Sequence, residues 1–567
     1  MKSTQLIELF LLCVSIAACG GGSSGSSSGA VTLTVTPPTA TVAAGQSEQF
    51  TATSSNGSTG AITWEVSGTA GGNSSVGTIS ASGVYTAPSV PPISQPVTIT
   101  ATESGISGSA AVTVAYSNAT LMGQYVFTFS EFQNGVATDS VGIVNALGDG
   151  ILSGTEDVNG PGGLFTAVPV TGSYSLSADG QGTLILDGGS AGTLTLTLSL
   201  VVGAGEGVLT DDSTGRIGAG NLYPVTGSVM TTADLSGNYT VSLGNGLGVG
   251  GADNSAGLLD LSGGLVVSGS MDENDLGSYL QSGTVSGIYA TSGGNRGTLT
   301  LTVGANTHHY VFYAVSPGQL ELMCTDNACN NAGELDAQTS QAVPSGSGVL
   351  LVSGEGTGQM PDVLVAAAGL TSTSSTGGTA SLTMYENENG SYASTIGSTT
   401  YTVSTSGRGE MTLPTPFGSR NFVFYVQSPG ILNLLESSSG YGNTAGNEYA
   451  TQSNAAAVAG EYVFLAAGQA PNSSTVSTAQ AILQVTSSGQ VTGQEQLNAG
   501  GVISTLPING TFTAQKTAGI YTMTLNLGGG QTESYVLVAI AQGDLVAMGS
   551  DSDEVRGGAM YIQYMTP

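Results

Sequence analysis

Apolar and polar residues alternate along most of this chain in short runs, and glycine, asparagine, aspartate or serine interrupts them. Val31-Thr-Leu-Thr-Val35, Val97-Thr-Ile-Thr-Ala101 and Ala110-Ala-Val-Thr-Val114 are clear examples. A period of two is typical of half-buried β-strands. After residue 19, no segment keeps an apolar period of 3.6 residues between helix caps. The pattern therefore predicts an all-β protein.

Residues 30–116 form a first unit of about seven short predicted strands. The strand Ile62-Thr-Trp64-Glu-Val66, a glycine-rich link and the turn Gly83-Val-Tyr-Thr-Ala-Pro88 follow one another. These residues resemble a bacterial Ig-like domain of group 2. The resemblance implies an Ig-like β-sandwich that acts as a spacer or an adhesive module at the cell surface.

The rest of the chain repeats itself. Opening segments at Gly123-Gln-Tyr125, Gly237-Asn-Tyr239, Gly348-Val-Leu350 and Gly460-Glu-Tyr462 recur at spacings of 114, 111 and 112 residues. Two further markers keep the same step: a Gly-Thr-Leu type segment at Gly182, Gly297, Gly409 and Gly519, and an aromatic segment at Tyr310–Tyr313 and Phe422–Tyr425. Three markers in register predict four β repeats, at residues 119–230, 231–343, 344–454 and 455–567.

Each repeat holds roughly eight alternating segments, which predicts an antiparallel β-meander closed as a small barrel or folded as a sandwich. We favour the barrel, because closure removes exposed strand edges in a chain with few lysines to protect them. The period is longer than a solenoid unit, so we expect separate domains. Strung out, five such domains would reach roughly 170 Å.

The N-terminus has the layout of an export signal. Lys2 precedes an apolar stretch from Leu6 to Val14, and small residues lead to Cys19. The residues before Cys19 resemble a bacterial lipobox, which implies a signal peptide over residues 1–18 and acylation of Cys19. Residues 19–29 then form the lipid anchor and a flexible Gly/Ser tether. Gly20 after the cysteine implies sorting to the outer membrane. The alternative is an ordinary secretory signal.

Acidic residues outnumber basic residues 38 to 7, and the net charge is −31. Such a field repels nucleic acid and anionic lipid, so neither is an expected partner. We expect a lipid-anchored, extracytoplasmic protein that faces an extracellular protein or glycan.

Cys324 and Cys329 are the two cysteines left outside the N-terminal region. They flank a turn-like loop, so a local disulfide is expected in an oxidising compartment. Free thiols or a zinc site with His308 or His309 are alternatives, although a fourth ligand is missing from the sequence.

Motifs for catalysis are weak. Gly188-Gly-Ser-Ala-Gly192 matches G-x-S-x-G, and residues 246–251 match the dinucleotide fingerprint, but glycine is abundant and no helix is predicted to follow either motif. We therefore expect no catalytic residues and no cofactor.

Acidic and amide residues cluster at similar places in the repeats. Calcium is coordinated by several oxygens, so these clusters are calcium candidates: Asp157, Asn159, Asp272, Asp275, Glu386 and Glu388. The alternative is a solvated loop, which we favour because no EF-hand or nonapeptide calcium motif is present.

These observations predict a non-enzymatic cell-surface lipoprotein, an adhesive or structural stalk that displays the Ig-like and β-repeat domains. One alternative is a carrier of small apolar ligands in calycin-like barrels, because Gly-x-Tyr resembles the Gly-x-Trp of lipocalins over three residues per repeat. A second is a secreted hydrolase accessory protein. Filled barrel interiors would favour the first function, and an open interior would favour the carrier.

Overall fold

The structure is a computed structural model that describes residues 30–565 except 134–135, 202–204, 212, 245–253, 276–277, 327–328, 330, 356–359, 439–442, 453–454 and 474. The predicted signal peptide, Cys19 and the tether lie outside the described residues. Within them the chain is all-β, as the alternation predicted, with three short 3₁₀ turns at Asn118–Thr120, Gly189–Ala191 and Thr232–Asp234.

The N-terminal unit contains eleven short strands in three small sheets. Its core packs Trp64 and Val66 against Ile99 and Val112, and the rings of Phe50 and Tyr85 meet edge-on with centroids 6.4 Å apart. The strands are β1 (Leu33–Thr36), β2 (Thr39–Ala43), β3 (Ser47–Gln49), β4 (Thr51–Ser54), β5 (Thr63–Val66), β6 (Thr69–Ala70), β7 (Gly72–Asn73), β8 (Gly77–Ile79), β9 (Val84–Thr86), β10 (Val97–Glu103) and β11 (Ile106–Ala115).

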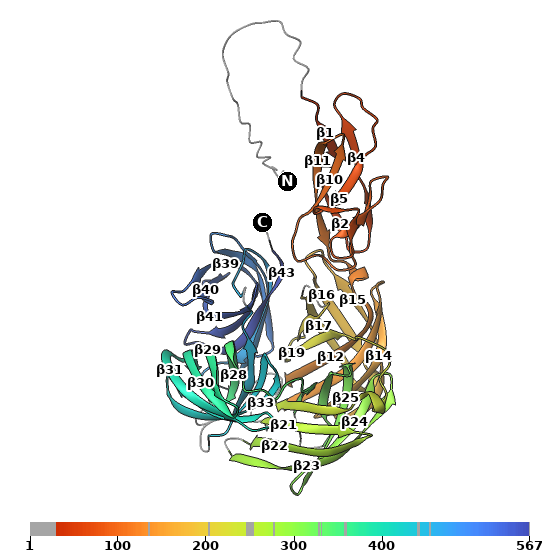
Figure 1. The fold of residues 1–567 in the computed structure, drawn as a ribbon. Coiled ribbons are helices and arrows are strands. Elements are labelled where there is room, and N and C mark those ends of the chain that lie inside the picture. The colour runs from red at the N-terminus through yellow and green to blue at the C-terminus, as the bar shows by residue number, and fades with distance from the viewer. Residues whose placement is uncertain are drawn as a thin grey trace, which may run out of the picture.

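Each repeat forms a closed barrel of eight antiparallel strands (Figure 1), so the preference for a barrel over a sandwich is confirmed. Barrel 1 consists of β12 (Met122–Gln133), β13 (Val136–Leu147), β14 (Ile151–Gly160), β15 (Gly163–Leu176), β16 (Gln181–Asp187), β17 (Thr193–Leu200), β18 (Gly207–Asp211) and β19 (Ile217–Pro224). Barrel 2 consists of β20 (Gly237–Gly244), β21 (Asn254–Ser262), β22 (Leu265–Asp275), β23 (Ser278–Gly293), β24 (Arg296–Val303), β25 (Asn306–Ser316), β26 (Gln319–Cys324) and β27 (Ala332–Ala337).

Barrel 3 consists of β28 (Gly346–Glu355), β29 (Pro361–Ser374), β30 (Gly377–Glu388), β31 (Ser391–Val403), β32 (Arg408–Thr415), β33 (Gly418–Ser428), β34 (Ile431–Glu436) and β35 (Asn443–Ala450). Barrel 4 consists of β36 (Gly460–Gln469), β37 (Val476–Val485), β38 (Gln490–Ala499), β39 (Val502–Ala514), β40 (Ile520–Leu527), β41 (Thr532–Ala541), β42 (Asp544–Gly549) and β43 (Val555–Met565).

The repeat markers recur because they fill the barrel interiors. Phe312 and Phe424 are buried inside barrels 2 and 3, opposite Gly297 and Gly409 on the neighbouring strand. A Cβ built on either glycine would lie 2.2 Å from Cζ of the facing ring, so only glycine leaves room for the phenylalanine. The two markers are therefore the two halves of one packing contact.

The barrels are not strung out as beads. Barrels 1 to 4 pack in chain order, and barrel 4 returns to barrel 1, where Thr197 Oγ1 donates to Gln496 Oε1 over 2.7 Å. The four barrels thus form a closed ring, which corrects the expectation of an extended row. Strand alternation predicts what lies inside each barrel, but the outward faces bury against other barrels only in the tertiary structure.

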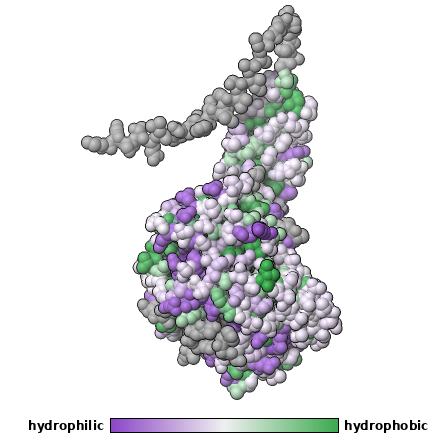
Figure 2. All heavy atoms as spheres, turned by 90° about the vertical axis from the view of Figure 1, so that its left-hand side faces the viewer, coloured by the Kyte–Doolittle hydropathy of each residue, from purple (hydrophilic) through white to green (hydrophobic). Residues whose placement is uncertain are grey.

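The N-terminal unit contacts barrels 1 and 4, the first and last barrels of the chain. The backbone N–H of Tyr116 donates to the carbonyl of Ala178 in barrel 1, and the N–H of Met565 in barrel 4 donates to the carbonyl of Ile93. This unit therefore sits where barrels 1 and 4 meet, and it projects from the rounded body of the ring (Figure 2).

On the face shown in Figure 2, most of the surface lies near the middle of the hydropathy scale, with small separate hydrophobic and hydrophilic patches. In the described part of the chain, no helix is long and apolar enough to cross a membrane.

Candidate functional site

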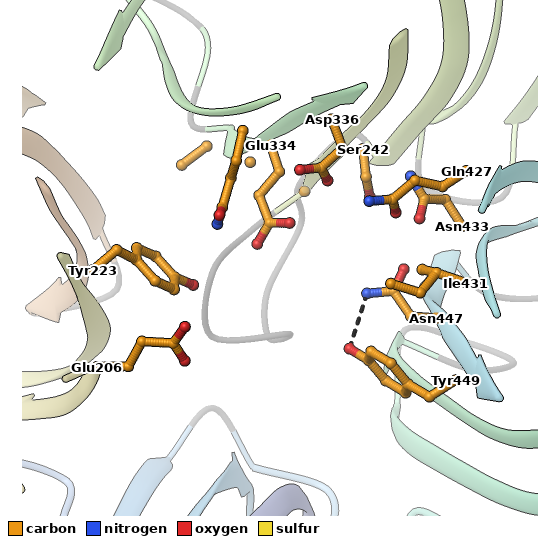
Figure 3. A pocket seen from close by; sticks show the side chains of 14 residues that line it. Glu206, Tyr223, Ser242, Glu334, Asp336, Gln427, Ile431, Asn433, Asn447 and Tyr449 are labelled. Atoms are coloured by element: carbon orange, nitrogen blue, oxygen red, sulfur yellow. Dashed lines mark hydrogen bonds between the residues drawn. The ribbon is translucent and has the colours of Figure 1, made fainter. Parts of the chain in front are cut away.

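A cavity of about 600 Å³ lies in the middle of the ring, where barrels 1, 2 and 3 line it (Figure 3). We call it the axial cavity. Its lining includes Glu206 and Tyr223 from barrel 1, Glu334 and Asp336 from barrel 2, and Tyr449 from barrel 3. In Figure 3 these side chains point from opposite sides toward a common space. The axial cavity is therefore formed where barrels 1, 2 and 3 face one another.

The repeats build this cavity with equivalent positions. On the last strand of each barrel, one residue pairs with the residue three positions after a glycine of the first strand (Gly123, Gly237, Gly346 or Gly460): Tyr223, Asp336, Tyr449 and Tyr561. The strand before it begins directly after Glu206 in barrel 1 and at Gln319, Ile431 and Asp544 in barrels 2, 3 and 4. Equivalent positions of the four repeats therefore carry different side chains toward one centre.

Tyr561 of barrel 4 is not a lining residue, but it lies close enough to Glu206, Glu334 and Tyr449 of the lining to interact with them electrostatically. Burial raises the pKa of Tyr561, and the negative charges of Asp544, Glu206 and Glu334 raise it further, as does Tyr449. Burial likewise holds the pKa of Tyr223 well above its ordinary value, and the negative charges of Glu321 and Glu334 raise it further. The hydroxyls of these tyrosines therefore stay protonated and can donate hydrogen bonds.

Three carboxyl groups of barrel 2 crowd one wall. Glu321 and Glu334 face each other directly across β26 and β27, and Gln319 Nε2 donates to Glu321 Oε1 over 3.1 Å. Asp336 is 8% exposed, and its carboxyl hydrogen-bonds to that of Glu334. Burial raises the pKa of Asp336 to about 8 and also raises the pKa of Glu334 and Glu321, with their mutual repulsion as the second cause for Asp336 and Glu321.

The described lining of the axial cavity contains no lysine, arginine or histidine. On the opposite wall Asn447 Nδ2 donates to the Tyr449 hydroxyl over 3.2 Å, and Asn447 Oδ1 has no partner (Figure 3). Carboxyls, hydroxyls and amide oxygens are hydrogen-bond acceptors, and a cation among them would let the carboxyls ionise. Chemically, the site is suited to a positively charged donor.

The acidic clusters singled out as calcium candidates lie elsewhere, at the contacts between barrels. Asp157 of barrel 1 pairs with Arg296 of barrel 2, and Asp272 of barrel 2 pairs with Arg408 of barrel 3. Asn159 uses its Nδ2 to donate to backbone carbonyls of Cys324, Asp326 and Cys329. These side chains hold barrels together, and their oxygens and amide protons already have protein partners.

The remaining candidates are dispersed. Glu386 pairs with Arg420 inside barrel 3, Asp275 is exposed at the end of β22, and Glu388 ends β30. Across the described ranges, no group of three or more His, Cys, Asp or Glu residues is placed to hold a metal ion.

Cys324 and Cys329 are joined by a disulfide, with Cα atoms 5.9 Å apart. The carbonyls of both cysteines accept from Asn159, so this loop forms the docking point of barrel 1 on barrel 2. His309 Nδ1 lies 2.8 Å from Asp326 Oδ1 on the same loop.

The G-x-S-x-G segment forms a 3₁₀ turn at Gly189–Ala191 between two strands, without the strand-to-helix elbow of a hydrolase nucleophile. Residues 246–251 lie outside the described residues.

Sequence reasoning missed the residues of the axial cavity. Their signal was present: Tyr223, Asp336, Tyr449 and Tyr561 recur at spacings of 113, 113 and 112 residues. Because repeat 2 has an aspartate where the others have a tyrosine, the position is visible only after the last strands of the repeats have been aligned.

Comparison with known proteins adds little. No protein family matches the chain, and no curated protein matches it. The solved structure of kievitone hydratase from Nectria haematococca aligns over 40% of this chain and 93% of that chain, at 10% identity and a TM-score of 0.19. A likeness this weak bears on neither the fold nor the activity of this protein.

Proposed function

We propose that this protein is a lipid-anchored surface protein that binds a cationic ligand in the axial cavity and performs no chemistry on it. Cys19 carries the anchor, the Gly/Ser tether and residues 30–116 set the distance from the membrane, and the ring of barrels is the binding head. The N-terminal unit serves as an Ig-like spacer; its buried Trp64 and packed sheets support that assignment.

The observation that carries this proposal is where the open space lies. Buried side chains fill the barrel interiors, for example Phe127 in barrel 1, Phe312 in barrel 2, Phe424 in barrel 3 and Phe464 in barrel 4. The large cavity lies between the barrels instead. This packing favours a ligand at the axis over an apolar ligand carried inside a barrel.

The lining defines the class of ligand. A cavity of about 600 Å³ has the size of a small-molecule site, and convergent groups with perturbed pKa values mark such sites. Asp336, nine-tenths buried, has a carboxyl for its only polar side-chain partner among the described residues. An extended polyamine would place several ammonium groups among these carboxyls, and tyrosine rings also attract cations.

Spermidine binding to the purified ectodomain tests the site. Calorimetry at about pH 8 should show saturable binding to the wild type. The double variant Glu334→Gln/Asp336→Asn should bind at least about tenfold more weakly, because the ligand loses its buried charge partners. Glu410→Gln, on a carboxylate with a half-exposed side chain, is the matched control and should leave binding unchanged. Equal binding by all three proteins, or none, would refute the axial site.

Membrane fractionation tests the anchor. Cys19→Ser should move the full chain from the membrane fraction to the soluble fraction, because the acyl chains are the proposed membrane attachment. Firm membrane association of the variant would contradict the lipoprotein assignment.

A further inference from the structure

A second cavity, of about 190 Å³, opens at one end of barrel 1. We call it the mouth of barrel 1. Its lining includes Glu131, Thr138, Ser140, Glu156 and Arg216. Glu131 follows the inward-facing Phe127 and Phe129 on β12, so it continues the inner face of the barrel to its rim.

Glu156 lies against this cavity without a partner. It is 3% exposed, and no described residue donates a hydrogen bond or an ion pair to its carboxyl. Burial, together with the negative charges of Asp157 and Asp187, raises its pKa to about 7. A buried carboxyl without a donor is costly, which makes an external donor favourable.

In barrels 3 and 4, an arginine of the same barrel donates hydrogen bonds to the buried carboxylates. Inside barrel 3, Arg420 Nη1 donates to Glu386 Oε1 over 2.8 Å and Nη2 donates to Glu436 Oε2 over 2.6 Å. Inside barrel 4, Arg556 Nη1 donates to Glu533 Oε1 over 2.6 Å. Both guanidiniums are nearly completely buried among carboxylates.

Barrel 4 allows a direct comparison. Glu495 stands three residues before Asn498 just as Glu156 stands three before Asn159, and the positive charge of Arg556 acts on Glu495. In barrel 1 the arginine is Arg216. It reaches Glu131 at 3.2 Å, its side chain is 33% exposed, and it makes no ion pair with Glu156. Barrel 1 therefore has a buried carboxyl beside an open cavity, whereas barrels 3 and 4 have a buried guanidinium against their carboxylates.

We propose that the mouth of barrel 1 binds a small organic cation, an ammonium or guanidinium group that pairs with Glu156. The hydroxyl oxygens of Ser140 and Thr138 line the same cavity and can accept further N–H donors. At about 30 Å³ per water, the volume corresponds to roughly six water molecules, which suits a single charged head group. This site is separate from the axial cavity and does not depend on it.

Methylguanidinium and n-butylammonium are the probes, titrated calorimetrically into the intact ectodomain at about pH 8, above the pKa of Glu156. Both should bind, and Glu156→Gln should weaken them at least about tenfold. The conservative change also removes like-charge repulsion from Asp157, so the variant should fold. The titrations use the Glu334→Gln/Asp336→Asn background, which removes the axial site, and Glu410→Gln, on a carboxylate outside both cavities, is the matched control that should leave binding unchanged.

The pH dependence gives a second readout. Asp157 and Asp187 are the charges that act on Glu156, and Glu131 and Arg216 line the same cavity. Burial and the two aspartates raise the pKa of Glu156 to about 7, and burial also raises the pKa of Glu131. Binding to the wild type should weaken severalfold between about pH 8 and about pH 6 as Glu156 takes up a proton. Undetectable binding of both probes, or affinities unchanged by Glu156→Gln, would overturn the proposal.

The source of the cation can be separated in the same experiment. The tripeptide Gly-Arg-Gly should bind more tightly than methylguanidinium if the natural ligand is an arginine side chain of another protein, and more weakly if it is a free amine or guanidine. Loss of either interaction in Glu156→Gln supports the shared chemistry, and its retention in that variant contradicts it.

Discussion

Arg296 forms a bidentate ion pair with Asp157 across the contact between barrels 1 and 2, with Nε 2.8 Å from Oδ2 and Nη2 2.6 Å from Oδ1. The Tyr313 hydroxyl donates to the same carboxylate over 2.7 Å. Arg408 and Tyr425 repeat this arrangement on Asp272 between barrels 2 and 3. The ring is therefore held at two of its four contacts by the same buried, bidentate ion pair.

Breaking one such pair should destabilise the protein strongly. Asp157 is fully buried, so Asp157→Asn leaves the Arg296 guanidinium without its counter-ion, and we expect a loss of about 3–5 kcal/mol in chemical denaturation. The double variant Asp157→Asn with Arg296→Met should recover part of this loss. Glu410→Gln, which removes an exposed partner of Arg408, should cost less than about 1 kcal/mol. Similar losses for the buried and the exposed pair would contradict this account.

The contact between barrels 3 and 4 uses different chemistry at the same positions. Ile520 pairs with Val538 as Arg296 pairs with Tyr313, and both pack in an apolar cluster with Tyr385. Ile520→Arg would bury a charge without a counter-ion, and we expect a loss of several kcal/mol in the free energy of unfolding. Adding Tyr385→Asp should restore part of it. No rescue by the second change would show that these positions are not equivalent to the Asp–Arg pairs.

An asparagine docks each barrel on the next. Asn498 Nδ2 donates to the carbonyls of Asp211 and Arg216 and so closes the ring between barrels 4 and 1. Asn498→Ala leaves these carbonyls without their donor and should cost about 1–3 kcal/mol. We expect faster proteolysis and a larger radius of gyration in solution scattering. Asn526→Ala removes a surface hydrogen bond to the Asn509 carbonyl and serves as the control that should leave both unchanged.

Glycine is required in the barrel wall where an aromatic side chain packs against it. Gly409→Ala would place Cβ 2.2 Å from Cζ of the buried Phe424, so the phenylalanine must leave its position. We expect a loss of about 1–3 kcal/mol or more, measured by thermal unfolding. Gly318→Ala is the matched control, because its nearest side-chain neighbour, Cβ of Ala337, lies 3.6 Å from the new Cβ. Equal stability of the two variants would rule out this packing requirement.

The stability of the fold should fall as the pH rises. Burial raises the pKa of Glu448 to about 7 and of Asp336 to about 8. The folded state therefore keeps protons that the unfolded state releases above about pH 4, and this stabilisation is lost as the pH rises through about 7–8. We expect a higher melting temperature at about pH 5 than at about pH 8. Glu448→Gln should flatten the profile, and a melting temperature that rises over this range would contradict the sign.

Much of the architecture was predictable because it depends on contacts between residues that are close in the sequence. The alternation of side chains identifies the strands, and Gly409 opposite Phe424 lies on a neighbouring strand of the same hairpin. Such contacts are short in sequence, so the three markers predicted four similar units of about eight strands, and the closed barrels confirm it. By contrast, the markers carry no information on the outward faces.

By itself, the sequence determined that the chain forms all-β repeats with one apolar face on each strand, because that face is specified by the period of two. Only the tertiary structure decided that the repeats close into a ring and enclose an acidic cavity. Asp157 and Arg296 are 139 residues apart, and Tyr223 meets Glu334 only when two barrels are docked. No periodicity links such pairs, since barrel docking depends on the shape and charge of whole surfaces, which exist only after each barrel has closed.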